Sequence, residues 1–294
     1  MRDRKKVHDV TGKLIVGLGL GLGPAPIKDY LDDSHRAAEL GFDVIELPDH
    51  LGMVAPLPTL AAIATAVPRV RVTNLVLNAS FYRPHLLARD IAAVHQLSGG
   101  RFITSLGAGY AEQEFATVGI PYPSPGQRVR TVTSTASAIK DILADPAFVT
   151  HSDTPPPLTR IAGAGDRLLA SAAQYADMVL FDPVLTESAL AERIDYTRAH
   201  AGARAQDITF CFSFTDIALD DRTPDLAVLR SVLPHLSEEE LLALPAVLKG
   251  SLDEAIAKIR RLRELGIDYL TFDRTPSVDW NTLERLITAV RQDS

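Results

Sequence analysis

The sequence has a single cysteine, Cys211, among its 294 residues. One cysteine excludes an internal disulfide, and because Cys211 lies in the apolar stretch ITFCFSF, we expect a buried structural thiol rather than a nucleophile. No apolar run reaches the roughly 18–20 residues needed to span a bilayer. These absences predict a cytoplasmic protein with no membrane partner.

The sequence also lacks an excess of basic residues. The net charge is −7 and the pI about 5.6, and no basic run is interleaved with aromatic residues, which argues against a nucleic-acid partner. The basic start, MRDRKK, is expected to belong to a flexible tail over residues 1–12. Histidines show no metal-ligand spacing, since His85 and His95 lie ten positions apart, and we predict no metal site. Neither a nucleophile elbow nor a Ser–His–Asp trio is apparent.

What the sequence does contain is a repeated strand–helix pattern. Most of the apolar runs are nearly continuous, which is typical of parallel strands covered by helices. We predict one (β/α)8 barrel domain over residues 1–294, because no linker divides the chain. Expected strands cover 13–22, 43–51, 70–78, 101–109, 157–165, 177–183, 207–219 and 267–273. Expected helices cover 27–41, 57–67, 84–100, 128–143, 167–176, 186–200, 225–248, 251–265 and 281–290.

The stretch LIVGLGLGLGPAP, residues 14–26, could be mistaken for a dinucleotide-binding loop. That fingerprint needs glycines at i, i+2 and i+5, but the third position falls on Leu22, Pro24 or Pro26 in the three possible registers. Only the acidic Glu46, at the end of the next strand, fits. We therefore interpret the stretch as the first barrel strand.

Alternation along that strand places the leucines on one face and the glycines on the other. Glycine in a strand often marks a close approach by another group. Two explanations stay open at this stage: the glycine face leaves room for a ligand near the barrel mouth, or it lets neighbouring barrel side chains pack tightly. The four glycines are Gly17, Gly19, Gly21 and Gly23.

Polar and glycine-rich segments follow several predicted strands, at the end of a barrel where active sites form. Asp49 and His50 come just after the second strand, and Asn74, within the third, needs a partner if it is buried. The stretch IAGAGD leads from the fifth strand into a helix, whose exposed N–H groups suit a phosphate. Asp166 in this stretch is expected to cap the helix.

Four segments together resemble the luciferase-like monooxygenase superfamily, in particular its coenzyme F420-dependent branch. The most specific pattern is LSGGRF followed by LGAG and then an E-F-x-x-x-G-I run. The segments occur in the order and spacing of that family and cover most of the chain: 37–51, 75–129, 160–180 and 247–270.

The resemblance implies a barrel that holds F420, or alternatively FMN, at its C-terminal mouth. The family often has a non-proline cis peptide in the third strand, which would lie at Asn74 and Leu75 here. The implied cofactor-binding residues are Asp49, Asn74, Leu75, Leu77, Gly107, Gly109, Gly163, Ala164 and Gly165, the last three forming the phosphate loop.

One departure affects the chemistry. Some family members carry a proton-donating glutamate directly after the fourth-strand GxG, where this chain has Tyr110, with Glu112 and Glu114 beyond it. The candidate catalytic residues are therefore His50, Asp49, Tyr110 and Glu112, with the proton donor left open.

The function predicted from these residues is hydride transfer between F420 and a small organic substrate, in an enzyme that the resemblance implies is a homodimer. Two alternatives remain. One is an FMN-dependent monooxygenase, and the other is a barrel that binds flavin or deazaflavin without turnover.

Overall fold

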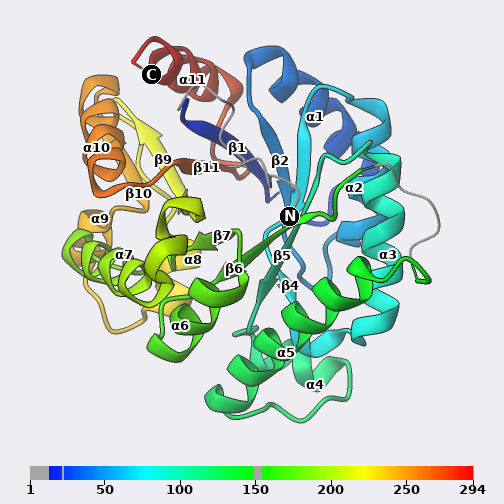
Figure 1. Cartoon of the computed structure of the whole chain (residues 1–294). Helices are drawn as coiled ribbons and strands as arrows, with labels where there is room; N and C mark the ends of the chain where they lie inside the picture. Colours follow the sequence, from blue (N-terminus) through cyan, green and yellow to red (C-terminus); the bar gives the residue numbers. More distant parts are fainter. Residues whose placement is uncertain (1–12, 22, 149–153, 294) are drawn as a thin grey trace.

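Parallel strands close into a barrel at the centre of the computed structural model, which describes residues 13–21, 23–148 and 154–293 (Figure 1). The predicted tail over 1–12 and Leu22 lie outside the described residues. Successive barrel strands are hydrogen-bonded neighbours, and β1 also pairs with β11, so the predicted (β/α)8 barrel is confirmed. The barrel strands are β1 (Ile15–Leu20), β2 (Val44–Leu47), β3 (Arg71–Asn74), β4 (Leu77–Asn78), β5 (Phe102–Gly107), β6 (Leu158–Ala162), β7 (Met178–Leu180), β8 (Thr209–Phe214) and β11 (Tyr269–Arg274).

Helices surround the barrel (Figure 1). Local sequence explains several of their ends: Gly41 and Gly266 adopt left-handed conformations after α1 and α10, and Ser124 and Ser251 form capping boxes before α5 and α10. The α-helices are α1 (Ile27–Leu40), α2 (Pro56–Ala66), α3 (Pro84–Leu97), α4 (Glu112–Thr117), α5 (Pro125–Ala144), α6 (Asp166–Tyr175), α7 (Glu187–Ala201), α8 (Ala227–Val232), α9 (Glu238–Ala243), α10 (Leu252–Leu265) and α11 (Trp280–Gln292). Short 3-10 turns are η1 (Ala79–Phe81) and η2 (Gly202–Asp207).

The region after the seventh barrel strand differs from the prediction. The single helix expected at 225–248 is wrong: α8 ends just before Pro234, α9 ends just before Pro245, and β10 (Val247–Gly250) follows. Proline lacks the N–H that a helix interior requires, so these residues break the stretch. The strand expected at 207–219 also divides, because β9 (Asp216–Leu219) leaves the barrel to pair with β10 in a separate two-stranded sheet.

Apolar side chains pack on both sides of the barrel strands. The larger core lies between the strands and the helices, and the smaller core fills the barrel interior with side chains that include Ile15, Ile103, Met178 and Cys211. Burial raises the pKa of the Cys211 thiol, and the side chain is fully buried. Cys211 is thus a packing residue, as the sequence predicted.

The glycine face of β1 points toward the barrel interior, and neighbouring side chains occupy the space beside it. A Cβ at Gly17 would overlap Oε1 of Glu46 and lie 2.9 Å from the Tyr269 hydroxyl. At Gly19 it would overlap Oδ1 of Asp273. Of the two explanations, tight packing accounts for Gly17 and Gly19.

Within the described ranges, no helix has the length and apolar character needed to cross a membrane. The same ranges hold no group of three or more His, Cys, Asp or Glu side chains arranged to bind a metal ion.

Candidate active site

A chain of polar contacts links the loop after β2 with α4 at the C-terminal end of the barrel. Nδ1 of His50 lies 2.8 Å from Oε1 of Glu114, and the Tyr110 hydroxyl lies 3.3 Å from Nε2 of the same ring. A carboxylate only accepts hydrogen bonds, so Nδ1 of His50 carries the proton and Nε2 of the neutral ring accepts from Tyr110. His50 is thereby oriented and its Nε2 is the basic atom.

The two carboxylates that follow Tyr110 in the sequence, those of Glu112 and Glu114, differ in their contacts. Glu114 is partly buried and accepts from the Leu51 N–H as well as from His50. Glu112, the candidate catalytic residue named from the sequence, is the exposed first residue of α4. The sequence places both carboxylates after Tyr110, and only the fold shows that Glu114 is the one that contacts His50.

Asp49 holds the loop that follows β4. Its Oδ2 accepts from the Asn78 N–H and from the Tyr82 hydroxyl, each at 3.1 Å. Burial raises the pKa of Asp49, and these two hydrogen bonds partly oppose that increase. The side chain therefore joins the ends of β2 and β4, one residue from His50.

The third barrel strand is interrupted at the site. The Leu75–Val76 peptide bond is cis, one residue after the Asn74–Leu75 position that the resemblance implied, and it separates β3 from β4. Leu75 and Val76 are partly buried against the inner apolar cluster, whereas Leu77 is buried in the outer core. Asn74 is fully buried and has its expected partner, because its side chain bonds both the carbonyl and the N–H of Ser105.

The glycines of β5 and the loop after it accommodate this interruption. A Cβ at Gly107 would overlap the Val76 side chain, and one at Gly109, which has φ of +69°, would overlap Asn78. Both glycines therefore let the β3–β4 segment approach β5 closely. Leu75 and Val76 are left as an apolar platform on the inner side of the barrel end.

The loop of Gly163, Ala164 and Gly165 connects β6 with α6. Gly163 has φ of +150°, and a Cβ at Gly165 would meet no atom within 4 Å. No side chain caps α6, because Asp166 forms an ion pair with Arg193 instead of the predicted cap. An uncapped helix N-terminus beside open space fits a phosphate, since its N–H groups lack intrahelical partners.

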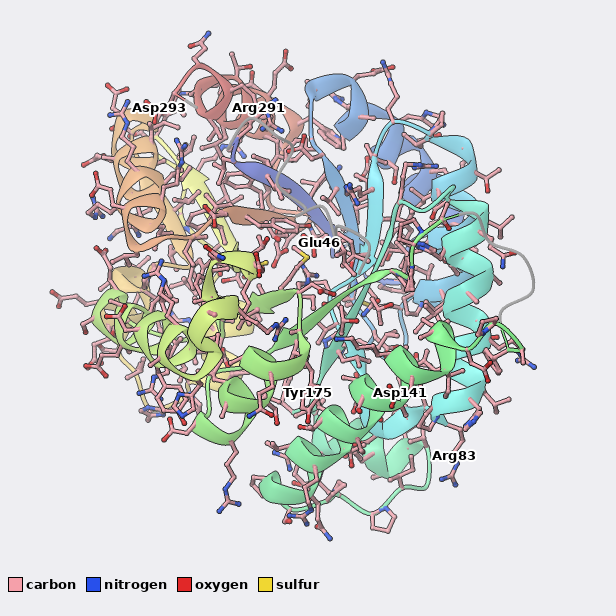
Figure 2. All side chains as sticks on the ribbon, viewed as in Figure 1. Glu46, Arg83, Asp141, Tyr175, Arg291 and Asp293 are labelled. Atoms are coloured by element: carbon pink, nitrogen blue, oxygen red, sulfur yellow. The ribbon has the colours of Figure 1, made fainter. Side chains whose placement is uncertain are left out.

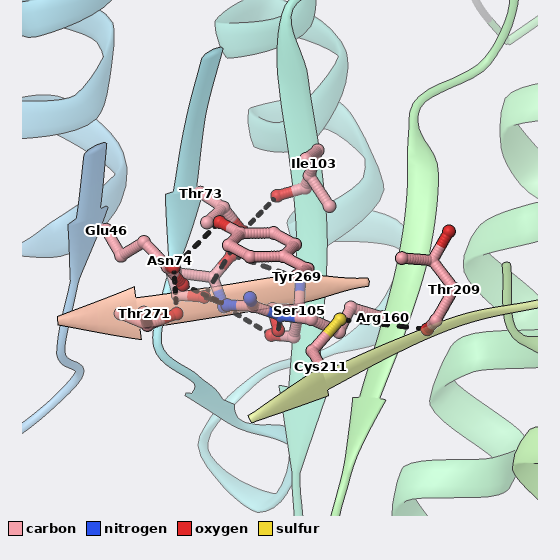
Figure 3. A network of polar contacts seen from close by, with 10 residues as sticks. All are labelled: Glu46, Thr73, Asn74, Ile103, Ser105, Arg160, Thr209, Cys211, Tyr269 and Thr271. Atoms are coloured by element: carbon pink, nitrogen blue, oxygen red, sulfur yellow. Dashed lines mark hydrogen bonds and ion pairs between the residues drawn. The ribbon is translucent and has the colours of Figure 1, made fainter. Parts of the chain in front are cut away.

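A buried polar network lies deeper in the barrel, and it was not predicted from the sequence (Figure 3). Glu46 and Arg160 are both fully buried and pair at 2.5 Å between Oε2 and Nη2. Tyr269 and Thr271 donate to Oε1 of Glu46 at 2.7 and 2.6 Å, and Arg160 also donates to Ser105. Burial alone would lower the pKa of Arg160, but the Glu46 carboxylate raises it, so the Arg160 guanidinium stays charged.

Figure 2 shows the central position of Glu46, whereas the other labelled residues lie nearer the periphery. The only sequence signal for this network is a charge within each of two apolar strands, VIEL and LTRIA. The network occupies the barrel interior and reaches the segment before Leu75, because Arg160 also donates to the Asn74 carbonyl at 3.1 Å.

Comparisons with known proteins agree with this geometry. The model of the family described as "Luciferase-like monooxygenase" matches residues 14–236. The "F420-dependent glucose-6-phosphate dehydrogenase" of Amycolatopsis mediterranei (strain U-32) is 24% identical, over 90% of this chain and 93% of that protein. The "FMNH(2)-dependent dimethylsulfone monooxygenase" of Pseudomonas putida is 23% identical, over 60% of this chain and 53% of that protein.

A solved structure has the same fold. It is described as "F420-dependent secondary alcohol dehydrogenase in complex with an F420-acetone adduct". The two superpose with a TM-score of 0.80 at 17% identity, over 95% of this chain and 98% of the other.

Proposed function

Because the chain belongs to the luciferase-like monooxygenase family, we propose that it is a coenzyme F420-dependent oxidoreductase acting on a small alcohol or its carbonyl product. The F420-dependent dehydrogenase relative aligns with nearly the whole chain, and the FMN-dependent relative with a smaller part. This difference supports F420 over FMN. When bound, F420 supplies a ring carbon that accepts or donates a hydride.

Residues at the C-terminal end of the barrel fit such a group. The backbone N–H groups that follow Gly165 would hold its phosphate, where a Cβ at Gly165 meets no atom within 4 Å. Leu75 and Val76 would support one face of its ring, because both are partly exposed apolar residues at this end of the inner cluster. Asp49 would fix the position of the Leu75–Val76 segment through its bond to the Asn78 N–H.

We assign proton transfer to His50. Nε2 of His50 would take the proton from a substrate hydroxyl during oxidation and return it during reduction. The Glu114 carboxylate, 2.8 Å from Nδ1, would stabilise the imidazolium that forms. The pKa of Tyr110 is raised by desolvation and by the charge of Glu114, so its hydroxyl stays protonated. When the substrate hydroxyl takes the place of the Tyr110 hydroxyl at Nε2 of His50, Tyr110 would donate its hydrogen bond to the substrate oxygen instead.

The observation that carries this proposal is the Glu114–His50–Tyr110 contact chain at the same end of the barrel as the Gly163–Gly165 loop. The test is to titrate the purified protein with F420 and with FMN, oxidised and reduced, and follow their fluorescence. Oxidation of 2-propanol and of glucose 6-phosphate is then assayed with bound F420. Tight F420 binding without FMN binding is expected. FMN binding alone would favour a monooxygenase, and binding of neither would refute a cofactor site.

We also propose that the whole chain, residues 1–294, acts as one domain in a cytoplasmic homodimer. Two exposed leucines on α3, Leu86 and Leu97, support an interface on this helix, since both are more than half exposed. The buried, unpaired cysteine supports a reducing compartment. Sedimentation equilibrium of the protein and of a Leu86→Lys variant would test the dimer.

A further inference from the structure

The buried side-chain atoms without a hydrogen-bond partner in the described ranges include one on β8 and one on the neighbouring β11, both near the C-terminal end of the barrel. They are Oγ of Ser213 on β8 and Oδ1 of Asp273 on β11. Ser213 is only 5% exposed and pairs in register with Thr271, whose hydroxyl contacts Glu46 in the barrel interior. Asp273 follows Thr271 by two residues and so shares its inward face. Buried polar atoms without partners are rare and point to a missing ligand group or water.

Gly19 provides the room for this carboxyl. It aligns with Asp273 across the β1–β11 pair, and a Cβ there would overlap Oδ1 of Asp273. The same Cβ position lies 3.3 Å from Cδ2 of Leu75. The Asp273 carboxyl is therefore a close neighbour of the platform that we assign to the cofactor ring.

The charges that face Asp273 keep its carboxyl neutral. Burial, followed by repulsion from Glu46 on β2 and Asp216 on β9, raises the pKa of Asp273 to about 8. Arg160 on β6 opposes this increase only weakly, because its guanidinium already bonds Glu46. At neutral pH the group is thus a carboxylic acid, which both donates and accepts hydrogen bonds.

We propose that Asp273 and Ser213 form a subsite for an uncharged group that both donates and accepts hydrogen bonds. Two sources have this chemistry: the imide edge of the F420 ring and the hydroxyl of the alcohol substrate. The surrounding carboxylates would disfavour an anion at the same place. This assignment rests on the proposed function, because it needs F420 at the barrel mouth.

The experiment compares F420 affinity, measured by fluorescence, in the wild type, Asp273→Leu and Asp273→Asn at pH 6.5 and pH 9. Leucine removes the hydrogen bonds and should weaken F420 binding about tenfold if the ring imide is the ligand. If the substrate hydroxyl is the ligand, F420 affinity stays unchanged and the KM for 2-propanol rises about tenfold instead. Asparagine keeps a donor and an acceptor, so the F420 affinity and the KM for 2-propanol should both stay within about threefold of the wild-type values at pH 6.5.

The pH comparison separates a ligand contact from a structural role. Raising the pH to 9 ionises Asp273 in the wild type and should weaken the same binding step, whereas Asp273→Asn should lack this additional loss. Asp253→Asn, in the first turn of α10, is the matched control and should behave as the wild type. Thermal unfolding checks the fold of each variant. If Asp273→Leu does not fold, Ser213→Ala replaces it and should weaken the same binding step about threefold.

The subsite is refuted if the leucine variant keeps both quantities within twofold of the wild type. In that case wild-type F420 binding persists and the proposed function stands. If the wild type itself binds no F420, the proposed function is wrong and the subsite assignment is overturned with it.

Discussion

Nδ1 of His50 lies 2.8 Å from Oε1 of Glu114, although 64 residues separate them in the sequence. The contact fixes the tautomer of the imidazole and directs Nε2 toward Tyr110. A histidine that is oriented by a carboxylate and shares its other nitrogen only with an exchangeable hydroxyl is a suitable acid–base group, so the pair connects the fold of the α4 segment to proton transfer.

Replacing Glu114 by glutamine should lower kcat for alcohol oxidation by about tenfold to a hundredfold, because the imidazolium loses its stabilising charge. F420 affinity, measured by fluorescence, should change by less than about twofold, since Glu114 contacts His50 rather than the cofactor loop. Glu112→Gln is the matched comparison, two residues away and exposed. A larger loss of kcat in Glu112→Gln than in Glu114→Gln would contradict the assignment.

His50→Ala should reduce kcat by roughly 10²- to 10⁴-fold, the usual contribution of a general acid–base group. The F420 dissociation constant should remain within about twofold. Stopped-flow absorbance of F420 measures hydride transfer directly. Unchanged turnover would remove His50 from this role.

Gly165→Asp should separate stability from cofactor binding. Aspartate is a favourable N-cap and would stabilise α6 by a few tenths of a kcal/mol relative to glycine, and a Cβ at this position meets no atom within 4 Å. Its negative charge would repel the cofactor phosphate and so weaken F420 binding at least about tenfold. Calorimetry with F420 and with its phosphate-free deazariboflavin chromophore provides the measurement. Equal weakening of both ligands would argue against a phosphate at this loop.

Local signals in the sequence were sufficient for the barrel, because each strand and helix carries its own pattern. The helices expected at 27–41 and 251–265 are present as α1 and α10, each followed by a left-handed glycine, and the Gly163–Gly165 loop lies between β6 and α6. The helix expected at 225–248 was wrong because Pro234 and Pro245 interrupt it, a local signal that the prediction did not use. The strand β10 was missed because it depends on β9, a partner that no local pattern indicates.

The site was predictable only in outline. His50 and Asp49 follow a strand, and this alone places them at the barrel end. The preference for Glu114 over Glu112 depends on how α4 packs against the loop after β2. Glu46 and Arg160 are 114 residues apart, so their pairing requires the closed barrel.

The Glu46–Arg160 pair should stabilise the fold strongly only while both partners are present. Glu46→Gln leaves Arg160 with a buried, uncompensated charge and should lower the free energy of unfolding by about 3–5 kcal/mol. The double variant Glu46→Gln, Arg160→Met removes that charge and should recover much of the loss. Urea unfolding of the single and double variants completes the cycle. Additive effects would show that the two side chains are not coupled.

The pKa of Asp273, raised to about 8 by burial and by repulsion from Glu46 and Asp216, makes stability depend on pH. An unfolded aspartate has a pKa of about 3.9, so between about pH 4 and pH 8 the native protein binds more protons than the unfolded chain. The contribution of Asp273 to the free energy of unfolding therefore falls as pH rises through this window, by up to about 1.4 kcal/mol per pH unit. Asp273→Asn should remove this pH dependence, so the free energy of unfolding of the variant minus that of the wild type should increase from pH 5 to pH 8. Urea unfolding at these two pH values measures it, with Asp253→Asn as the control that keeps the wild-type slope. A constant difference between Asp273→Asn and the wild type would mean that the Asp273 carboxyl is already ionised in the native protein.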